Sequence, residues 1–186
     1  LFSAVNIGGL TIGLAAAFSI ILFVRSEISF DQWLPKADSV YTVEAKYMPP
    51  GRAPKTLART PLELRASMEK DFSEIKSFTR FYAGVAPVKR AERSFPEKAF
   101  AVEETFFDVF ELSFLEGSGA TALSSGRAIV ISSAASEKYF PEEQALGQVL
   151  TIQEDDYTVS GVLAPLPGKS HLEFDILIFD GPGELN

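Results

Sequence analysis

The sequence predicts an α+β protein in which a membrane-spanning helix precedes a single mixed domain. Residues 1–24 are strongly apolar and contain no charged side chain. Beyond residue 30, short stretches of alternating apolar and polar residues indicate strands. Capping residues and Pro/Gly turns mark short helices between them. No repeat or low-complexity linker divides the chain. We therefore expect a helix over residues 1–26 and one folded domain over residues 27–186.

The composition favours a packed core and excludes several classes of function. Hydrophobic residues make up 46% of the chain, with 16 Phe, 5 Tyr and 1 Trp. The formal net charge is −8 and the pI is about 4.8, which argues against nucleic acid as a partner because its binding needs a basic surface. The chain has no cysteine, so disulfides, Cys-based zinc sites and thiol catalysis are excluded.

The apolar run from Leu1 to Val24 is long enough to cross a bilayer and contact membrane lipid, since a hydrocarbon core of ~30 Å needs about 20 helical residues. Two other interpretations compete with a spanning helix. A cleavable signal peptide has a basic start and a small-residue cleavage site, and neither is present. A buried core helix is usually shorter and carries polar positions at helical spacing. A spanning helix is therefore the favoured interpretation.

Small residues recur at four-residue spacing in this run. Gly9 and Gly13 form a GxxxG pair, and Ala17 continues the same face by one turn. Such a face allows another membrane helix to approach closely. Glycine that simply faces lipid is the alternative, because glycine is common in membrane helices.

The remaining pattern predicts short strands and helices. Thr60 is expected to cap a helix that starts at Pro61, with Glu63 completing a capping box, and Leu64, Met68 and Phe72 then form its apolar face. Ser132 or Ser133 is expected to cap a second helix. A strand containing Pro87 is expected at an edge. The predicted strands are 39–47, 75–82, 85–89, 98–103, 128–131, 149–152, 157–163 and 172–179, and the other predicted helices are 104–110 and 133–140.

The sequence offers little for catalysis or metal binding. His171 is the only histidine. Alternation along a strand would place it on one face with Glu173 and Asp175, but a surface histidine at a strand start is the commoner arrangement. No Walker A motif or nucleophile elbow is present. We therefore expect no enzyme activity in this chain.

Several short motifs occur in a characteristic order along most of the chain. They are Asn6–Gly13, Glu27–Asp31, Ala37–Val43, Glu103–Phe110, Phe114–Gly117, Ile129–Ser132, Glu137–Phe140, Leu146–Gly147, Tyr157–Val162 and Ser170–Asp175. In this succession the chain resembles the MacB-like periplasmic core region of the MacB/FtsX family of ABC-transporter permeases. It departs from the family pattern at Pro141, where glycine is frequent, and at Trp33, where phenylalanine is usual.

The resemblance implies a cytoplasmic N-terminus, a first helix leading outward through the bacterial inner membrane, and a two-lobed (porter/sabre-like) mixed α/β domain in the periplasm. It also implies further membrane helices, a second permease in a homo- or heterodimer, and a separate cytoplasmic ABC ATPase subunit. ATP would bind to that subunit, so no cofactor is expected in this chain. A periplasmic adaptor or a wall hydrolase is the kind of outer partner that the resemblance implies.

Two hypotheses of different classes follow. In the first, the domain transmits motion driven by ATP hydrolysis, and the junction formed by Arg25, Glu27, Phe30 and Asp31 is a lever, since no flexible Gly/Ser linker interrupts it. In the second, the chain is a membrane-anchored module that senses or binds a periplasmic ligand. An anchored hydrolase is a third reading that no set of catalytic residues supports.

Overall fold

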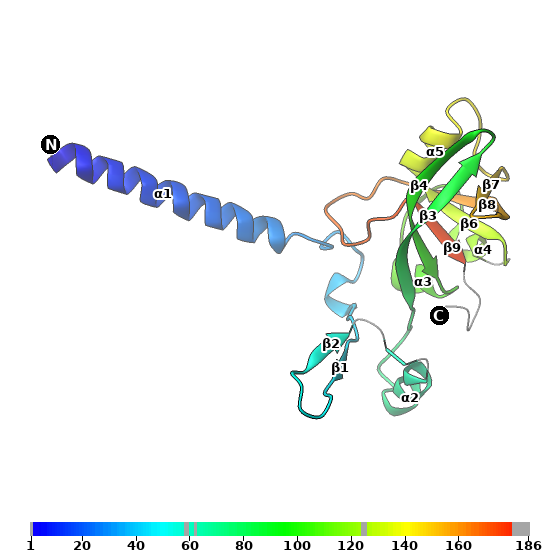
Figure 1. The fold of residues 1–186 in the computed structure, drawn as a ribbon, viewed down its shortest axis with the longest axis horizontal. Helices are drawn as coiled ribbons and strands as arrows, with labels where there is room; N and C mark the ends of the chain where they lie inside the picture. Colours follow the sequence, from blue (N-terminus) through cyan, green and yellow to red (C-terminus); the bar gives the residue numbers. More distant parts are fainter. Residues whose placement is uncertain (1, 58–59, 62, 124–125, 180–186) are drawn as a thin grey trace.

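A computed structural model describes residues 2–57, 60–61, 63–123 and 126–179. Figure 1 shows a long helix that projects away from a folded β-rich domain. The elements in chain order are α1 (Phe2–Glu27), the 3₁₀ turn η1 (Ala37–Ser39), β1 (Ala45–Tyr47), β2 (Lys55–Leu57), α2 (Leu64–Asp71), β3 (Phe81–Arg90), β4 (Arg93–Val102), α3 (Phe106–Val109), β5 (Phe114–Gly117), α4 (Gly119–Ala122), β6 (Ala128–Ser132), α5 (Ser133–Tyr139), β7 (Val149–Ile152), β8 (Asp155–Leu163) and β9 (Ile176–Phe179).

The helix α1 has the length and polarity of a membrane span. It contains 26 residues, and its most apolar window has a mean hydropathy of 2.3. At 1.5 Å per residue it is about 39 Å long, which exceeds the hydrocarbon core of a bilayer. None of its residues is buried by the domain. The predicted helix is therefore confirmed, apart from Leu1, which lies outside the described residues.

The main sheet closes on itself. Its strand order is β5-β8-β6-β9-β4-β3-β7, and β7 also pairs with β8. Among the described residues this pairing makes a ring of six strands, with β5 added beside the second half of β8. Gly161 makes the β5–β8 contact close, because a Cβ there would lie 2.7 Å from the Phe114 ring. The fold class predicted from the sequence, a mixed α/β domain behind an apolar helix, is confirmed.

The core occupies both faces of the sheet because successive strand residues point to opposite sides. Ile129 and Ile131 of β6 pack on one side with α5, whereas Val130 packs on the other with Phe106 of α3. The carboxylate of Glu97 is buried beside the cluster that contains Tyr139. Glu97 accepts a hydrogen bond from the Tyr139 hydroxyl at 2.6 Å and pairs with Lys138, which compensates its removal from water.

The long hairpin of β3 and β4 explains how proline fits this sheet. Pro87 stands opposite Pro96. Neither residue has an N–H group, so the two prolines can stand opposite each other only at a pair of positions that exchange no hydrogen bond. The strand containing Pro87 was expected at a sheet edge, but β3 lies between β4 and β7, and the Pro87 carbonyl accepts a hydrogen bond from the Gln153 amide. Only the first half of β3 has no second neighbouring strand among the described residues.

A smaller lobe precedes the sheet. It contains the two-stranded pair β1–β2 and the helix α2, which lies below the sheet in Figure 1. The described residues between 41 and 80 include none that is fully buried. The lobe therefore has no core of its own and depends on specific contacts to the sheet.

Three predictions were wrong in this lobe. Of the strand expected over 39–47, only residues 45–47 form a strand, β1, because β2 pairs with these residues alone. Residues 75–80 are not a strand, because no strand of the described chain pairs with them and their backbone bonds run to Phe72, Glu103 and Thr105 instead. The Thr105 hydroxyl donates to the Phe78 carbonyl, and the Arg80 amide donates to Glu103.

The third error concerns the start of α2. The helix begins at Leu64, and its N-cap is Glu63 with no side-chain cap bond. The Pro61 carbonyl instead accepts a hydrogen bond from the Leu64 amide at 3.1 Å, so a turn takes the place of the predicted first helical turn. Leu64 and Met68 are half-buried, and Phe72 is 54% exposed, which makes the apolar face weaker than expected.

The elements after residue 98 follow the prediction more closely. Ser132 caps α5, accepting a hydrogen bond from the Ala135 amide at 3.1 Å. The strands predicted at 149–152 and 157–163 form as β7 and β8, which pair as a hairpin with its turn at residues 153–154, and β8 starts at Asp155, two residues earlier than predicted. The last strand is shorter than expected: β9 covers residues 176–179, because residues 171–175 form a loop that makes polar contacts.

Candidate functional site

The end of α1 turns into the domain without a glycine. Ile28 still donates to the Val24 carbonyl at 3.0 Å, but Ser29 and Phe30 donate only three residues back, at 3.3 and 3.4 Å. This tightening is typical of a helix end. Asp31 then takes a left-handed conformation with φ 55°, which redirects the chain.

Asp31 joins this turn to a loop far along the sequence. Its carboxylate accepts hydrogen bonds from the Ser170 hydroxyl, from the His171 amide at 3.2 and 3.3 Å, and from His171 Nδ1 at 2.6 Å. Ser170 is buried, and its hydroxyl oxygen also accepts from the Leu172 amide at 3.0 Å. We call Asp31, Ser170 and His171 the clasp.

Backbone and ring contacts reinforce the clasp on both sides. The Lys169 carbonyl accepts from the Asp31 amide at 2.9 Å and from Trp33 Nε1 at 3.2 Å. The Phe30 ring lies 4.7 Å from the His171 ring. The lysine amine of Lys169 reaches back to Ser26 in the last turn of α1. In Figure 1 the loop between β8 and β9 extends from the sheet to meet the end of α1. The helix is thus fastened to the segment that leads into β9.

The electrostatics of Asp31 favour its charged form. Burial alone raises the pKa of this carboxyl. The hydrogen bonds from Ser170 and His171 outweigh burial, so the pKa of Asp31 lies below the ordinary value for aspartate. At neutral pH the clasp therefore contains a carboxylate that accepts several hydrogen bonds.

The predicted junction residues divide into two groups. Phe30 and Asp31 take part in the contacts just described. Arg25 and Glu27 are exposed, and their side chains make no polar contact within the described part of the chain. Their role in a lever remains a prediction. Gly9 and Gly13 have open space where a Cβ would stand, so the packing role predicted for them and for Ala17 also remains a prediction.

Sequence reasoning missed Lys169 and Ser170. Ser170 is 139 residues from Asp31, and no local pattern links such positions. The signal available was the pair of motifs Glu27–Asp31 and Ser170–Asp175, both of which belong to the ordered series in the sequence.

The three residues that strand alternation would place on one face, His171, Glu173 and Asp175, contact Asp31 and Lys98 rather than a common metal site. His171 binds Asp31, Glu173 pairs with Lys98 at 2.6 Å, and Asp175 accepts from the Lys98 amide at 2.9 Å. Within the described ranges no group of three His, Cys, Asp or Glu side chains is arranged to hold a metal ion. Glu173 and Asp175 instead hold the loop to Lys98 of β4, and His171 holds it to Asp31.

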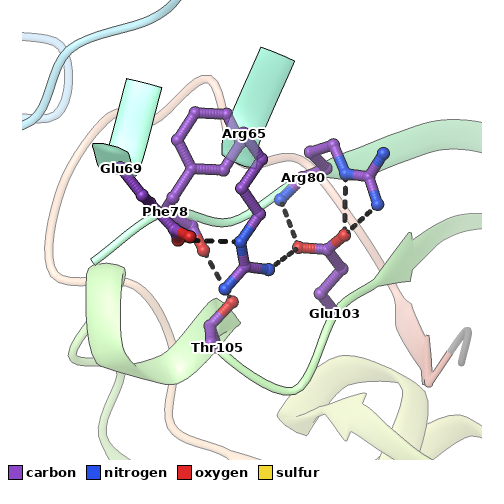
Figure 2. Close-up of polar contacts among 6 residues, drawn as sticks. All are labelled: Arg65, Glu69, Phe78, Arg80, Glu103 and Thr105. Carbon is purple, nitrogen blue, oxygen red and sulfur yellow. Dashed lines mark hydrogen bonds and ion pairs between the residues drawn. The ribbon is translucent and has the colours of Figure 1, made fainter. Parts of the chain in front are cut away.

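A second polar cluster fastens the smaller lobe to the sheet (Figure 2). Glu103 is only 6% exposed and follows directly after β4. Its carboxylate accepts from Arg80 Nε at 2.7 Å and from an Arg65 guanidinium nitrogen at 3.1 Å. Arg65 belongs to α2 and also binds Glu69 at 2.9 Å. One buried carboxylate therefore holds both α2 and the segment before β3.

Comparisons with known proteins identify the family. The family model of the MacB-like periplasmic core domain matches residues 3–179. None of the curated proteins matches the chain. A domain of a Porphyromonas gingivalis protein described as a permease matches with a TM-score of 0.59 at 20% identity, over 69% of this chain and 57% of that one.

Two further solved structures match. The extracellular domain of the ABC-type transporter YknZ from Gram-positive bacteria has a TM-score of 0.50 at 19% identity, over 64% of each chain. The periplasmic region of MacB from Actinobacillus actinomycetemcomitans has a TM-score of 0.46 at 17% identity, over 61% of this chain and 54% of that one. The chain thus spans less than two thirds of the length of each of these structures. At 20% and 19% identity, the Porphyromonas gingivalis domain and the YknZ domain support the fold alone. The assignment to a family rests on the family model.

The matched range runs from α1 into β9 and includes both sides of the clasp. The family consists of components of transporter permeases rather than of enzymes, and its domain lies outside the cytoplasm on a membrane anchor. The chain belongs to the family of MacB-like periplasmic core domains of ABC-transporter permeases.

Proposed function

We propose that this chain is the outer, motion-transmitting part of an ABC-transporter permease in the bacterial inner membrane. ATP hydrolysis by a separate cytoplasmic subunit would move α1, and the junction would relay that movement to the periplasmic domain. Export, or action on an adaptor or wall hydrolase, would follow on the outer side. The complete permease would pair with a second permease and cross the membrane with further helices.

The observation that carries this proposal is the clasp. A helix that merely anchors a domain needs no rigid connection, and a flexible linker is sufficient for it. Here the turn after α1 is held by the Asp31 carboxylate, by two hydrogen bonds to the Lys169 carbonyl and by the ring contact of Phe30 with His171. Such a connection transmits displacement and rotation of the helix to the sheet.

The first test asks whether the complete permease purifies from native membranes in a mild detergent together with an ABC ATPase subunit. We expect stoichiometric recovery of that subunit. Recovery of the permease without any ATPase, together with tight binding of a periplasmic ligand, would favour the anchored sensing module instead.

The second test measures transmission directly and needs no substrate. The sequence has no cysteine, so spin labels on Val5→Cys in α1 and Glu137→Cys in α5 would be the only labels in this chain. In the reconstituted permease–ATPase complex, we expect trapping with ATP and vanadate to change the distance distribution between the two labels.

A short run of glycines inserted between Glu27 and Ile28, where α1 ends, should abolish this change while ATP turnover continues. The matched control inserts the same run after Glu154, in the exposed turn between β7 and β8. The lever hypothesis is wrong if the junction insertion and the control insertion give the same nucleotide-dependent change in the distance between the labels.

A further inference from the structure

One edge of the main sheet is open beside β3. β3 pairs with β4 along its whole length but with β7 only at Val88 and Lys89. In the part of the chain that the structure describes, no other strand lies against Phe81–Val85. Figure 1 shows the first half of β3 extending toward α2, whereas β7 pairs with the other end of β3.

The direction of the free backbone groups follows from the pairing. The Gln153 amide donates to the Pro87 carbonyl at 3.1 Å, so the backbone of Pro87 faces away from β4. Hydrogen-bonding direction alternates along an antiparallel strand. The N–H and C=O groups of Phe81, Ala83 and Val85 therefore also point to the open edge.

This edge lacks the features that usually prevent strand addition. Exposed edges normally carry charged side chains, proline or a bulge. Residues 81–86 include no charge and no proline, and Phe81, Tyr82 and Val85 are 42%, 49% and 69% exposed. Pro87 offers no donor, so an added strand would pair along residues 81–85.

A shallow hollow adjoins the edge on the face that carries Phe100. Its volume is about 380 Å³. The lining is mainly apolar, with the Lys98–Glu173 ion pair and His171 of the clasp at its border. The residues that line it are Ala83, Gly84, Val85, Lys98, Phe100, His171 and Glu173.

We propose that residues 81–85 bind an extended segment of a partner polypeptide as an additional β-strand, with an apolar side chain of that segment in the hollow. Free backbone donors and acceptors in register select an extended chain, and a neighbouring pocket supplies side-chain preference. The occupant would then contact His171, whose ring also binds Asp31 at the end of α1. A segment bound at the edge would therefore touch a residue of the junction contacts.

A second copy of this chain fits the edge less well. Pairing of two β3 strands about Ala83 would bring Phe81 of one copy toward the hollow of the other. That ring is already stacked on Phe100 at 5.2 Å and packed edge-on against Phe106 and Phe110 at 6.0 Å. Ala83 offers only a methyl group. A foreign segment can supply the larger apolar side chain that the hollow accommodates.

The test uses the full chain in detergent and a displayed library of short peptides of random sequence. We expect selection to yield peptides with alternating apolar residues whose affinity falls about tenfold or more for Val85→Pro, because that change removes one outward N–H group without breaking a bond to β4. Proline is compatible with this alternation, as Pro87 shows. Val85→Thr keeps the N–H group, so its affinity for the peptides should fall far less than that of Val85→Pro.

A second arm needs no protein variant. N-methylation of alternate amides in a selected peptide should abolish binding for one set of positions and spare the other, which only strand addition predicts. The proposal is overturned if selection yields no binder, if the peptides bind Val85→Pro equally well, or if both methylated sets bind alike. It is also overturned if the unaltered chain is a dimer in detergent that Val85→Pro converts to monomers, since the edge would then pair with a second copy. These measurements involve no ATP, so their failure leaves the proposed coupling function untouched.

Discussion

At the scale of single residues, the junction depends on the Asp31 carboxylate, whose side chain is 27% exposed. Asp31→Ala leaves the Ser170 hydroxyl and the His171 amide without their acceptor. Hydrogen bonds to charged groups contribute roughly 1.5–3 kcal/mol each to stability. Because water can take over part of this hydrogen bonding at a partly exposed site, we expect a loss of about 2 kcal/mol in the free energy of unfolding.

Urea unfolding and hydrogen exchange measure the effect. The amides of residues 169–172 should exchange faster in Asp31→Ala than in the unaltered chain. Asp38→Ala is the matched control, because Asp38 is exposed and its side chain makes no polar contact among the described residues. Equal exchange in the two variants would show that the clasp does not hold the loop.

The same carboxylate makes the stability of the junction depend on pH. The pKa of Asp31 is lower in the folded chain than in an unfolded one, in spite of burial, because Ser170 and His171 hydrogen-bond the charged form. Its contribution is therefore present above the ordinary pKa of aspartate, about 3.9, and is lost as the pH falls through the lower folded value. We expect the stability difference between the unaltered chain and Asp31→Ala to be constant near neutral pH and to shrink below about pH 4. A difference that stays constant in acid would contradict the assigned hydrogen bonds.

At the scale of elements, Glu103 connects α2 and the segment before β3 to the sheet. Glu103→Ala leaves Arg65 and Arg80 without their buried partner. Breaking a buried ion pair by removing one member costs about 3 kcal/mol or more. Because the smaller lobe has no core of its own, we expect α2 and residues 75–80 to exchange amide hydrogens faster, whereas β6 is unaffected. Glu69→Ala, which removes only the exposed partner of Arg65, should cost less than about 1 kcal/mol. Equal exchange of α2 in the two variants would contradict this role of Glu103.

The helix α5 depends on its cap. Ser132→Ala removes the acceptor of the Ala135 amide and should lower the free energy of unfolding by about 1 kcal/mol. Ser133→Ala, one residue further on, removes no hydrogen bond that caps the helix and should have a smaller effect. Thermal unfolding of the two variants, with the unaltered chain as reference, measures the difference. Equal losses would show that the cap bond contributes nothing specific.

The same elements show which features a sequence can reveal. The cap of α5 was predictable because its donor and acceptor lie three residues apart. The strand expected over 75–82 begins only at Phe81, because Phe78 and Arg80 form hydrogen bonds with Thr105 and Glu103, which the local pattern does not show. Asp31 was identified as a junction residue from its place after the apolar run. Its partners Ser170 and His171 were not identified, because only the folded chain brings them together.

At the scale of the whole molecule, α1 projects away from the sheet (Figure 1). Its surface is exposed along its full length, and Gly9 and Gly13 have no neighbour within 4 Å of a would-be Cβ. A face of small residues that nothing in the described chain covers is free to receive a helix of the complete permease or of its partner permease. The clasp would then connect that helix contact to the outer domain.

This view predicts that bulk on the small-residue face weakens assembly. Gly9→Leu with Gly13→Leu should reduce the amount of differently tagged second permease that purifies with the full-length protein, because close helix approach in lipid depends on small side chains. Leucine is apolar, so membrane insertion should not suffer. Ala15→Leu adds similar bulk about 200° around the helix from Gly13 and is the matched control. If the control and the double variant recover equal amounts of partner, Gly9, Gly13 and Ala17 face lipid, and the contact that moves α1 must lie on another side of the helix.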